Sequence, residues 1–250
     1  MHETNHLLIT GAGRGIGAAT ALLAAQRGHD VTINYVADRR AADGVAQAVR
    51  RLGRRAAVIQ ADVGKPEDVI RLFSEAENAL GPVSGLVNNV GITGPIGPFS
   101  RTTDATIERV FQVNVYGVMR CCRQAVQRFT ERNHPGVIVN VSSVAATTGS
   151  PNEYIHYAAS KAAVETFTLG LAKEVARTGV RVCGVAPGTT LTDIHTTAGE
   201  PGRPDRVAPN IPMGRVGRPE EIAEAIVWLL SPAASYMTGN TLQCAGGLGS

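Results

Sequence analysis

Residues 7–17 of the chain are LLITGAGRGIG, a short apolar run followed by four glycines in seven positions and then by an alanine-rich stretch with helical periodicity. Glycines between a strand and a helix allow a tight turn, let the backbone approach a pyrophosphate, and expose the helix N-terminal amides to its charge. A plain tight turn would use the same residues, but the position in the first strand–helix unit favours a nucleotide site. A phosphate-transfer loop is disfavoured, because that motif ends in Gly-Lys-Ser/Thr and the first lysine here is Lys65.

Outward from this turn, short β-branched runs alternate with helical stretches along the whole chain. One helix is expected over 66–80, ending before Gly81-Pro82, and another over 219–230, ending before Ser231-Pro232. The alternation is typical of a parallel sheet with helices on both faces, so we predict an α/β fold: a single Rossmann-type doubly wound domain over 1–250. The expected strands are 7–10, 31–34, 57–60, 85–87, 137–141, 180–185 and 241–244.

The composition excludes several classes of protein. With 250 residues, 44% of them hydrophobic and 18% charged, the chain is neither a disordered polyelectrolyte nor a disulfide-stapled miniprotein. Its 24 basic and 21 acidic residues give a net charge of only +3, which argues against a nucleic-acid partner. The four cysteines have no zinc-type spacing, so we expect no metal and reduced thiols. No signal peptide and no apolar run of the ~20 residues that a membrane span needs is visible, so we expect a cytoplasmic protein that does not contact a membrane.

One segment interrupts the alternation of strands and helices. Glycines and prolines crowd residues 188–217, directly after the sixth expected strand. Long loops of this kind in compact domains are usually functional lids or disordered insertions. Because open α/β folds bind ligands at the carboxyl edge of the sheet, we predict that this segment is a substrate lid.

The end of the second expected strand bears on which dinucleotide binds. NAD-specific folds place an acidic residue there to hold the ribose 2′-hydroxyl, whereas this chain has Asn34 and Tyr35. Arg14 in the glycine turn, with Arg39 and Arg40 after the strand, would offer cations to a 2′-phosphate. NADP(H) is therefore favoured as the cofactor and NAD(H) is possible, because arginine is abundant throughout the chain and its presence here is only a partial signal.

A second pattern, YAASK, places Tyr157 and Lys161 four residues apart at the start of a helical stretch. Such residues share one helix face, with Cβ atoms about 5–6 Å apart. A tyrosine whose pKa is near ~10 is a poor proton carrier at neutral pH, and a nearby ammonium stabilises the phenolate and lowers that pKa. The pair is therefore predicted to carry acid–base chemistry. Tyr154 lacks such a lysine and is expected to be structural or to face the substrate.

With these two patterns, the chain resembles the short-chain dehydrogenases/reductases over essentially its whole length. Within that family it is most similar to the glucose-dehydrogenase-like and 3-oxoacyl-reductase-like members. The motifs that carry the resemblance, in the family's order and spacing, are TGAGRGIG at 10–17, Asp62, NNVG at 88–91, Asn114, Ser142-Ser143, YAASK at 157–161, Pro187-Gly188 and Thr192.

The resemblance implies a catalytic set of four residues. Tyr157 would be the general acid/base, and Lys161 would lower the pKa of that tyrosine and bind the nicotinamide ribose. Ser143 would polarise the substrate carbonyl, with Ser142 as its neighbour in the strand. Asn114 would hold a water that connects the lysine to solvent.

The resemblance also implies which residues contact the cofactor. Asp62 and Val63 would meet the adenine ring. Asn89 and Gly91 would line the adenosine ribose, and Thr192 would bond the carboxamide. The complete expected set is Gly11, Arg14, Gly15, Ile16, Gly17, Asn34, Tyr35, Asp62, Val63, Asn89, Gly91, Tyr157, Lys161, Pro187, Gly188, Thr190 and Thr192.

Four positions have competing interpretations. Asp62 would also suit a helix cap ahead of Pro66, and Asn88 is better explained as a tie between strands than as a ligand contact. His156, beside the tyrosine, is expected at the surface or in the pocket wall rather than in acid–base chemistry. Val90 replaces the alanine usual in the motif, and its two extra methyl groups would narrow the adenosine site.

These observations predict an NADP(H)-dependent oxidoreductase that interconverts a secondary alcohol and a ketone in a small molecule. The alternative is a non-catalytic nucleotide-sensing or regulatory protein, because a fold alone does not fix function. Residues 93–99, 144–153 and 189–215 are expected to wall the substrate pocket, and their composition leaves sugars, 3-oxoacyl thioesters, steroids and small ketones open.

The resemblance further implies a homotetramer. Its contacts would come from the helices that carry Asn114 and Tyr157 and from the C-terminal helix and strand. In this chain, the apolar content of 225–230 and the closing stretch 237–247 favour such contacts.

Overall fold

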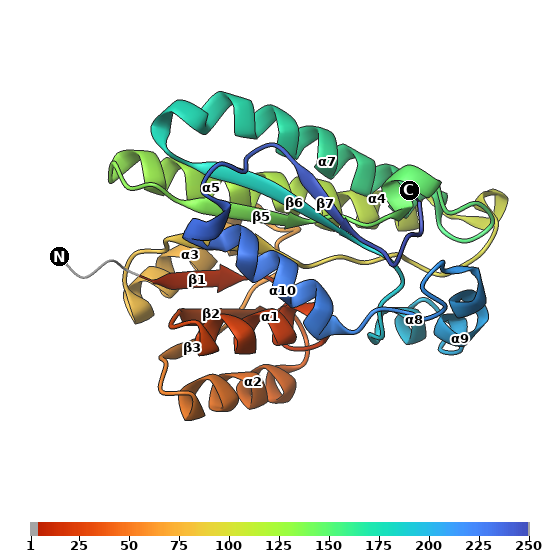
Figure 1. Cartoon of the computed structure of the whole chain (residues 1–250), viewed down its shortest axis with the longest axis horizontal. Coiled ribbons are helices and arrows are strands. Elements are labelled where there is room, and N and C mark those ends of the chain that lie inside the picture. Colours follow the sequence, from red (N-terminus) through yellow and green to blue (C-terminus); the bar gives the residue numbers. More distant parts are fainter. Residues whose placement is uncertain (1–4, 250) are drawn as a thin grey trace.

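The computed structural model describes residues 5–249, and its centre is one seven-stranded sheet with helices on both faces (Figure 1). The strand order is β3-β2-β1-β4-β5-β6-β7, and every pairing is parallel. All seven predicted strands are confirmed, with ends that differ by one or two residues. The strands are β1 (His6–Ile9), β2 (Asp30–Tyr35), β3 (Ala56–Gln60), β4 (Gly85–Asn88), β5 (Val137–Val141), β6 (Arg181–Pro187) and β7 (Thr241–Cys244).

The core lies in two layers because successive side chains of a strand point to opposite faces of the sheet. Leu7 and Ile9 of β1 pack on one face, whereas Leu8 packs on the other. Both faces are covered, which explains why β1, β4 and β5 are mostly apolar rather than alternating. The first face is covered by α1 (Gly15–Gln26), α2 (Arg39–Arg51) and α10 (Pro219–Leu230), and the second by α3 (Pro66–Leu80), α5 (Val118–Glu131) and α7 (Ile155–Val175).

Helices α3 and α10 begin and end where the sequence predicts. Each has proline at its first position, where a missing amide hydrogen costs no hydrogen bond. Each also carries two acidic residues in its first turn, which favour the positive end of the helix dipole. The second face also carries α4 (Asp104–Phe111), which continues through a π-helix at Gln112–Gly117 into α5, and short 3-10 helices lie at Phe99–Arg101, Ala176–Thr178 and Pro232–Ala234.

The segment 188–217 is an ordered excursion at the carboxyl edge of the sheet. It contains α8 (Ile194–Thr197), α9 (Arg203–Val207) and a 3-10 helix at Ala208–Asn210. Its two ends are tied together, because the amide of Gly217 donates to the carbonyl of Thr189 and the amide of Leu191 donates to the carbonyl of Gly217, both at 2.9 Å. Figure 1 shows α8 and α9 on the side toward which the strands run.

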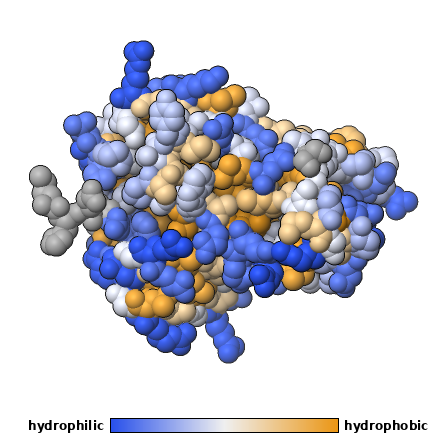
Figure 2. All heavy atoms as spheres, in the orientation of Figure 1, coloured by the Kyte–Doolittle hydropathy of each residue, from blue (hydrophilic) through white to orange (hydrophobic). Residues whose placement is uncertain are grey.

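The apolar run 225–230 serves the protein's own core, which corrects the reason for expecting it at a subunit contact. Ile226, Val227, Leu229 and Leu230 are buried, and within this run only Trp228 is exposed. The same helix packs closely against α1 on one face of the sheet. Figure 2 shows hydrophilic side chains over much of this face of the molecule, with apolar ones gathered toward its middle.

Candidate active site

The glycine turn lies where the strand order reverses, between β1 and β4, which is where open α/β sheets bind ligands. Gly11 and Gly15 have φ values of +62° and +55°, a left-handed conformation that glycine adopts without strain. A Cβ on Gly17 would lie 2.5 Å from the carbonyl oxygen of Gly11, so α1 can begin this close to the turn only with glycine there. Arg14, at the N-cap of α1, makes no side-chain capping bond, which leaves the first amides of the helix available to an anion.

Side chains from three strands hold this turn in place. The hydroxyl of Thr10 accepts from the amides of Asn89 and Val90 at 3.1 and 3.2 Å, and the side-chain amide of Asn89 donates to the carbonyls of Thr10 and Gly11 at 3.0 Å. The side-chain oxygen of Asn34 accepts from the amide of Gly11 at 3.2 Å, and its Nδ2 donates to the carbonyl of Ala61 at 2.9 Å. Asn34 is fully buried and does not line the pocket, so its position is that of a support for the turn rather than of a cofactor contact.

The pocket lining that follows β2 contains a carboxylate that the sequence analysis did not find. Tyr35 and Asp38 both line the pocket, and Asp38 also caps α2 by accepting from the amide of Ala41 at 2.9 Å. The lining therefore holds a carboxylate as well as Arg14, where the sequence analysis expected cations in place of a repelling carboxylate. Arg39 and Arg40 do not line the pocket, whereas Arg14 does. An aspartate three residues before a helical amide is an N-cap signal that could have located Asp38.

Arg14 has a partner across the pocket mouth. Its guanidinium lies 3.6 Å from the carboxylate of Asp193 in the 188–217 segment. Both side chains are more than 60% exposed, so this pair contributes little to stability and leaves the guanidinium free to meet another anion.

Asp62 and Val63, which were expected at the adenine ring, lie outside the pocket lining. The carboxylate of Asp62 accepts from Arg109 at 2.8 Å and from the amide of Gly64 at 2.9 Å. Val63 is buried, and its side chain occupies the space that a Cβ on Gly117 would need. The N-cap of α3 is Lys65, so Asp62 does not cap that helix either. Asn88, by contrast, does tie strands together, because its Nδ2 donates to Asn140 Oδ1 at 2.9 Å.

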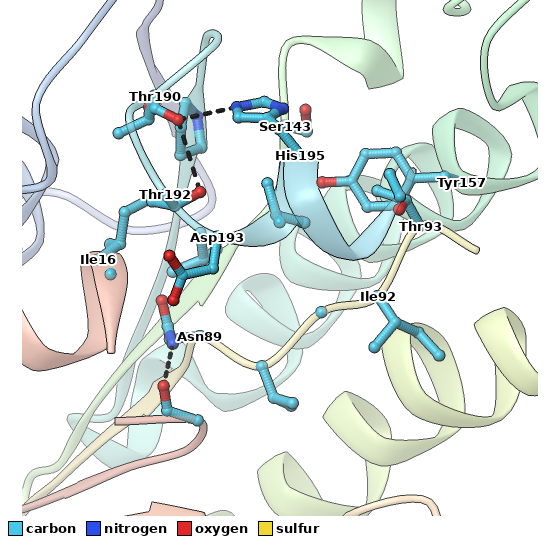
Figure 3. A pocket seen from close by; sticks show the side chains of 18 of the residues that line it. Ile16, Asn89, Ile92, Thr93, Ser143, Tyr157, Thr190, Thr192, Asp193 and His195 are labelled. Carbon is cyan, nitrogen blue, oxygen red and sulfur yellow. Dashed lines mark hydrogen bonds between the residues drawn. The ribbon is translucent and has the colours of Figure 1, made fainter. Parts of the chain in front are cut away.

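Ser143, Tyr157 and Lys161 meet at one end of the pocket. Ser143 follows β5, and the other two lie on one face of α7. Figure 3 shows Ser143 and Tyr157 at this end, with Ile16, Asn89 and Thr192 at the other. Lys161 Nζ donates to the carbonyl oxygen of Val141 at 2.8 Å and lies 5.7 Å from the ring centroid of Tyr157. The hydroxyl of Ser142 instead bonds Glu165 at 2.8 Å, which distinguishes the two serines.

Asn114 is brought to the same place by an irregular helix. It is fully buried in the π-helix, a form that occurs mostly as short interruptions of α-helices and often at functional sites. Its side chain bonds both backbone polar groups of Ile92, and its Nδ2 donates to the hydroxyl of Ser160 at 3.0 Å. A Cβ on Gly91 would lie 3.2 Å from Lys161 Nζ and 3.7 Å from Asn114 Oδ1. Because Gly91 has no side chain, Lys161 Nζ and Asn114 Oδ1 can both lie close to its backbone.

Burial shifts the acid–base properties of this cluster. Burial lowers the pKa of Lys161 from its usual 10.5 to about 8, although Glu165 opposes the shift. Burial raises the pKa of Tyr157, while a hydrogen bond from Ser143 and the charge of Arg203 oppose the rise. Burial therefore favours the neutral form of both groups and places the pKa of the ammonium below that of the phenol, although the two values are nearly equal in water. Perturbed pKa values of this kind cluster at functional sites.

The wall beyond Tyr157 is mainly apolar and comes from three parts of the chain that are distant in sequence. Tyr154 lies in this wall, as expected, and so does Leu248, which the sequence analysis missed. His156 is buried rather than exposed, and its Nε2 donates to the carbonyl of Thr93 at 2.7 Å. The wall residues are Val144, Ala145, Thr148, Ser150, Tyr154, Ile194, His195, Ala198, Arg203 and Leu248.

The remaining expected cofactor residues surround the glycine turn. Gly11, Gly15, Ile16, Asn89 and Gly91 line the pocket, whereas Gly17 does not. A Cβ on Gly15 would touch the side chain of Thr192, so the 188–217 segment and the glycine turn approach closely. From the chain after β5, the pocket is also lined by Pro187, Gly188, Thr190 and Thr192.

Residues 5–249 contain neither a cluster of side chains suited to a metal ion nor a helix suited to a membrane span. No group of three or more His, Cys, Asp or Glu side chains in this part of the chain is arranged to hold a metal ion. None of its helices combines the length and apolar content of a membrane span. All four cysteines are free thiols, and Cys121, Cys122 and Cys183 are buried.

Comparison with known proteins places the chain among oxidoreductases. A family profile described as enoyl-(acyl carrier protein) reductase matches residues 11–249. The uncharacterized oxidoreductase YgfF of Escherichia coli K12 is 48% identical over 96% of this chain and 98% of its own, and 3beta-hydroxysteroid dehydrogenase 1 of Eggerthella lenta is 41% identical over 97% and 92%. The crystal structure of 3-ketoacyl-(acyl-carrier-protein) reductase from Brucella melitensis complexed with NADH superposes with a TM-score of 0.91, at 33% identity over 99% of both chains.

The buried ammonium makes a prediction about stability. Below pH 8, Lys161 is charged in both the folded and the unfolded chain, and only the folded chain carries the cost of burying that charge. We expect Lys161→Met to increase the free energy of unfolding at neutral pH by about 1–2 kcal/mol, after allowing for the unpaired Val141 carbonyl. Urea denaturation measures this change.

The pH dependence provides the check. Between about pH 8 and 10.5, the wild-type folded chain has lost the proton that the unfolded chain still binds, so the wild type gains stability with rising pH and the difference narrows. Lys173→Met is the matched control, because Lys173 lies exposed on the same helix. A Lys161→Met protein less stable than wild type at pH 7 would contradict the argument.

Proposed function

Because the chain belongs to the short-chain dehydrogenase/reductase family, we propose that it interconverts a secondary alcohol and a ketone with a nicotinamide dinucleotide as cofactor. The observation that carries the proposal is the grouping of Ser143, Tyr157 and Lys161 at one end of a pocket whose other end is the glycine turn (Figure 3). A proton carrier and a nucleotide cradle thus open into one space, as hydride transfer to a carbonyl requires.

The residues at the glycine turn fit a dinucleotide. The first amides of α1 have no side-chain acceptor, and a pyrophosphate would supply one. Asn89, Gly91 and Thr192 line the pocket between the turn and the catalytic end, where they would hold the ribose and the carboxamide. When bound, the nicotinamide supplies or accepts the hydride, and the protein contributes geometry and a proton.

Three side chains of this chain then perform the acid–base part of the reaction. The hydroxyls of Ser143 and Tyr157 donate hydrogen bonds to the substrate carbonyl oxygen, where negative charge develops during reduction. Tyr157 passes its proton to that oxygen in reduction and takes a proton from the alcohol in oxidation. Lys161 stabilises the resulting phenolate, because its ammonium is held near the ring by the carbonyl of Val141.

The wall beyond Tyr157 supports a substrate whose alcohol is carried on an apolar body. Val144, Ala145, Ile194, Ala198 and Leu248 contribute apolar surface there. Such surface suits the rings of a steroid or another saturated cyclic alcohol, and the Eggerthella relative is named for a hydroxysteroid. We therefore infer a cyclic secondary alcohol as the substrate class.

Tyr157→Phe separates this function from a non-catalytic one. The variant keeps the ring but has no proton to transfer, so we expect kcat/KM for a cyclic ketone to fall by about 10²–10⁴-fold with the Kd for the reduced cofactor unchanged. Loss of nicotinamide absorbance follows turnover, and nicotinamide fluorescence follows binding. Tyr236→Phe is the control, because Tyr236 is fully exposed. Cofactor binding without turnover by the wild type across a broad panel of ketones would instead support a sensing protein.

We also propose that NADP(H) is favoured and NAD(H) accepted, because Arg14 and Asp38 act in opposite directions at the ribose end. Asp38→Asn keeps the helix cap and removes the charge that repels a 2′-phosphate, so we expect the NADP/NAD ratio of kcat/KM to rise about tenfold. Arg14→Ala should lower the same ratio. Arg39→Ala is the control, since Arg39 pairs with Asp43 away from the pocket. The proposal fails if both variants move the ratio in one direction.

A homotetramer belongs to the same proposal. Exposed apolar side chains lie on the three helical elements expected to form the contacts: Tyr116 in the π-helix, Leu169 on α7 and Trp228 on α10. We expect light scattering to give a mass four times that of one chain, and Leu169→Glu to lower it. A monomeric mass for the wild type would overturn this expectation.

A further inference from the structure

A buried arginine of the 188–217 segment lies in the wall of the substrate end. The side chain of Arg203, at the start of α9, is only 11% exposed. Its guanidinium bonds Glu153 through Nη2 at 2.5 Å and through Nε at 3.1 Å, and Nη1 donates to the hydroxyl of Thr189 at 3.3 Å. Burial of a charge costs free energy, which the hydrogen bonds to Glu153 and Thr189 offset. The same bonds hold the guanidinium in one orientation.

Arg203 is connected to the acid–base residue by two aromatic contacts. Its guanidinium carbon lies 5.2 Å from the ring centroid of Tyr154. The rings of Tyr154 and Tyr157 meet edge to face, with centroids 5.4 Å apart and an angle of 84° between their planes. Both geometries are attractive, so Arg203 and Tyr154 fix the orientation of the Tyr157 ring.

Arg203 also differs from Lys161 as a source of positive charge. Burial lowers the pKa of Lys161 to about 8, so the ammonium is lost in alkaline solution, whereas a guanidinium stays charged. The charge of Arg203 lowers the pKa of Tyr157, against the rise that burial causes. Burial tends to raise the pKa of Glu153, but the bonds from Arg203 and Arg206 outweigh it and lower that pKa. Glu153 therefore stays ionised and partly cancels the charge of its partner.

We propose that Arg203 is a positioning residue for the reaction: carried by the 188–217 segment and held by Glu153, it orients Tyr157 through Tyr154 and stabilises its phenolate. The inference rests on the proposed function of Tyr157 as the proton carrier. It makes the reactivity of the tyrosine depend on the seating of a segment that is distant in sequence. The titratable or charged groups around Tyr157 are Lys161 and His156 on its own helix, Glu153 and Tyr154 in the preceding turn, and Arg203 and His195 in the 188–217 segment.

Titration of Tyr157 itself tests the proposal without a substrate. The chain has five tyrosines, so a protein labelled at tyrosine 13Cζ gives few signals, and Tyr157→Phe identifies the one from Tyr157. In Arg203→Gln we expect the midpoint of this signal to move up by about 0.5–1 pH unit, because a cation that favours the phenolate is gone. The matched control is Arg206→Gln. Arg206 also pairs with Glu153 from the same segment, but it is half exposed and does not line the pocket.

Glu153→Gln distinguishes an electrostatic role from a merely structural one. It removes the anion that offsets Arg203, so the Tyr157 midpoint should move down, opposite to the shift in Arg203→Gln. Midpoints that rise in both variants, or that do not move in Arg203→Gln, would show that the ion pair only holds the segment and would overturn the proposal. If Arg203→Gln does not fold, Glu153→Gln alone tests the proposal. Any result other than a downward shift of the Tyr157 midpoint would then contradict it.

Kinetics then connect the titration to the reaction. Oxidation of an alcohol needs the phenolate, so the acid limb of the kcat profile should move up in Arg203→Gln by the same amount as the titration, with the cofactor Kd unchanged. A wild type that titrates as expected but turns over no alcohol would leave the electrostatic inference standing and refute the proposed function. The two failures are therefore distinguishable.

Discussion

The parallel direction of all seven strands is the constraint from which the site follows. Parallel strands end at one edge of the sheet, so every connection from a strand to the next helix begins there. The glycine turn follows β1, Asn89 follows β4, Ser143 follows β5 and the 188–217 segment follows β6. Residues as far apart in sequence as Gly11 and Arg203 thereby open into one pocket (Figure 1). The reversal of strand order between β1 and β4 separates the flanking connections and leaves room for a ligand.

The contacts that build this pocket are polar and buried, which makes them specific. Thr10, Asn34 and Asn89 use their side-chain donors and acceptors on backbone groups of the glycine turn and of the chain that follows β3 and β4. An unpaired group at any of these places would carry a desolvation cost of about 1–3 kcal/mol, so alternative arrangements of the turn are disfavoured. Lys161 is the extreme case, since its burial disfavours its own charge. The burial of this charge lowers the stability of the fold, and it places the ammonium of Lys161 beside the phenol of Tyr157.

Sequence predicted what is local and periodic, and missed what depends on side-chain direction. The seven strands, α3, α10 and the pair on α7 follow from hydrophobic periodicity, prolines and spacing, all of which act within a few residues. Asn34 was expected at the cofactor because of its place along the strand, but its side chain turns inward to Gly11. Asp38 was overlooked because an acidic contact was sought only at the strand end, at Asn34 and Tyr35, and the cap lies three positions beyond Tyr35. The pair of Arg203 and Glu153 joins residues fifty positions apart, and no local sequence pattern predicts it.

The 188–217 segment is held by different interactions from those of the core. This difference suits a segment that lies at the mouth of the pocket. Helices α1 and α10 are fixed by apolar burial, which water cannot replace. The segment is instead attached through Arg203 and Arg206, which both pair with Glu153, and through backbone hydrogen bonds of Ala198 with Ile96 and of Met213 with Gly246. Exposed members of such networks exchange protein partners for water at small cost. The guanidinium of Arg203 contacts the ring of Tyr154, and that ring in turn contacts Tyr157. Under the proposal, the orientation of the phenol therefore depends on the position of the 188–217 segment.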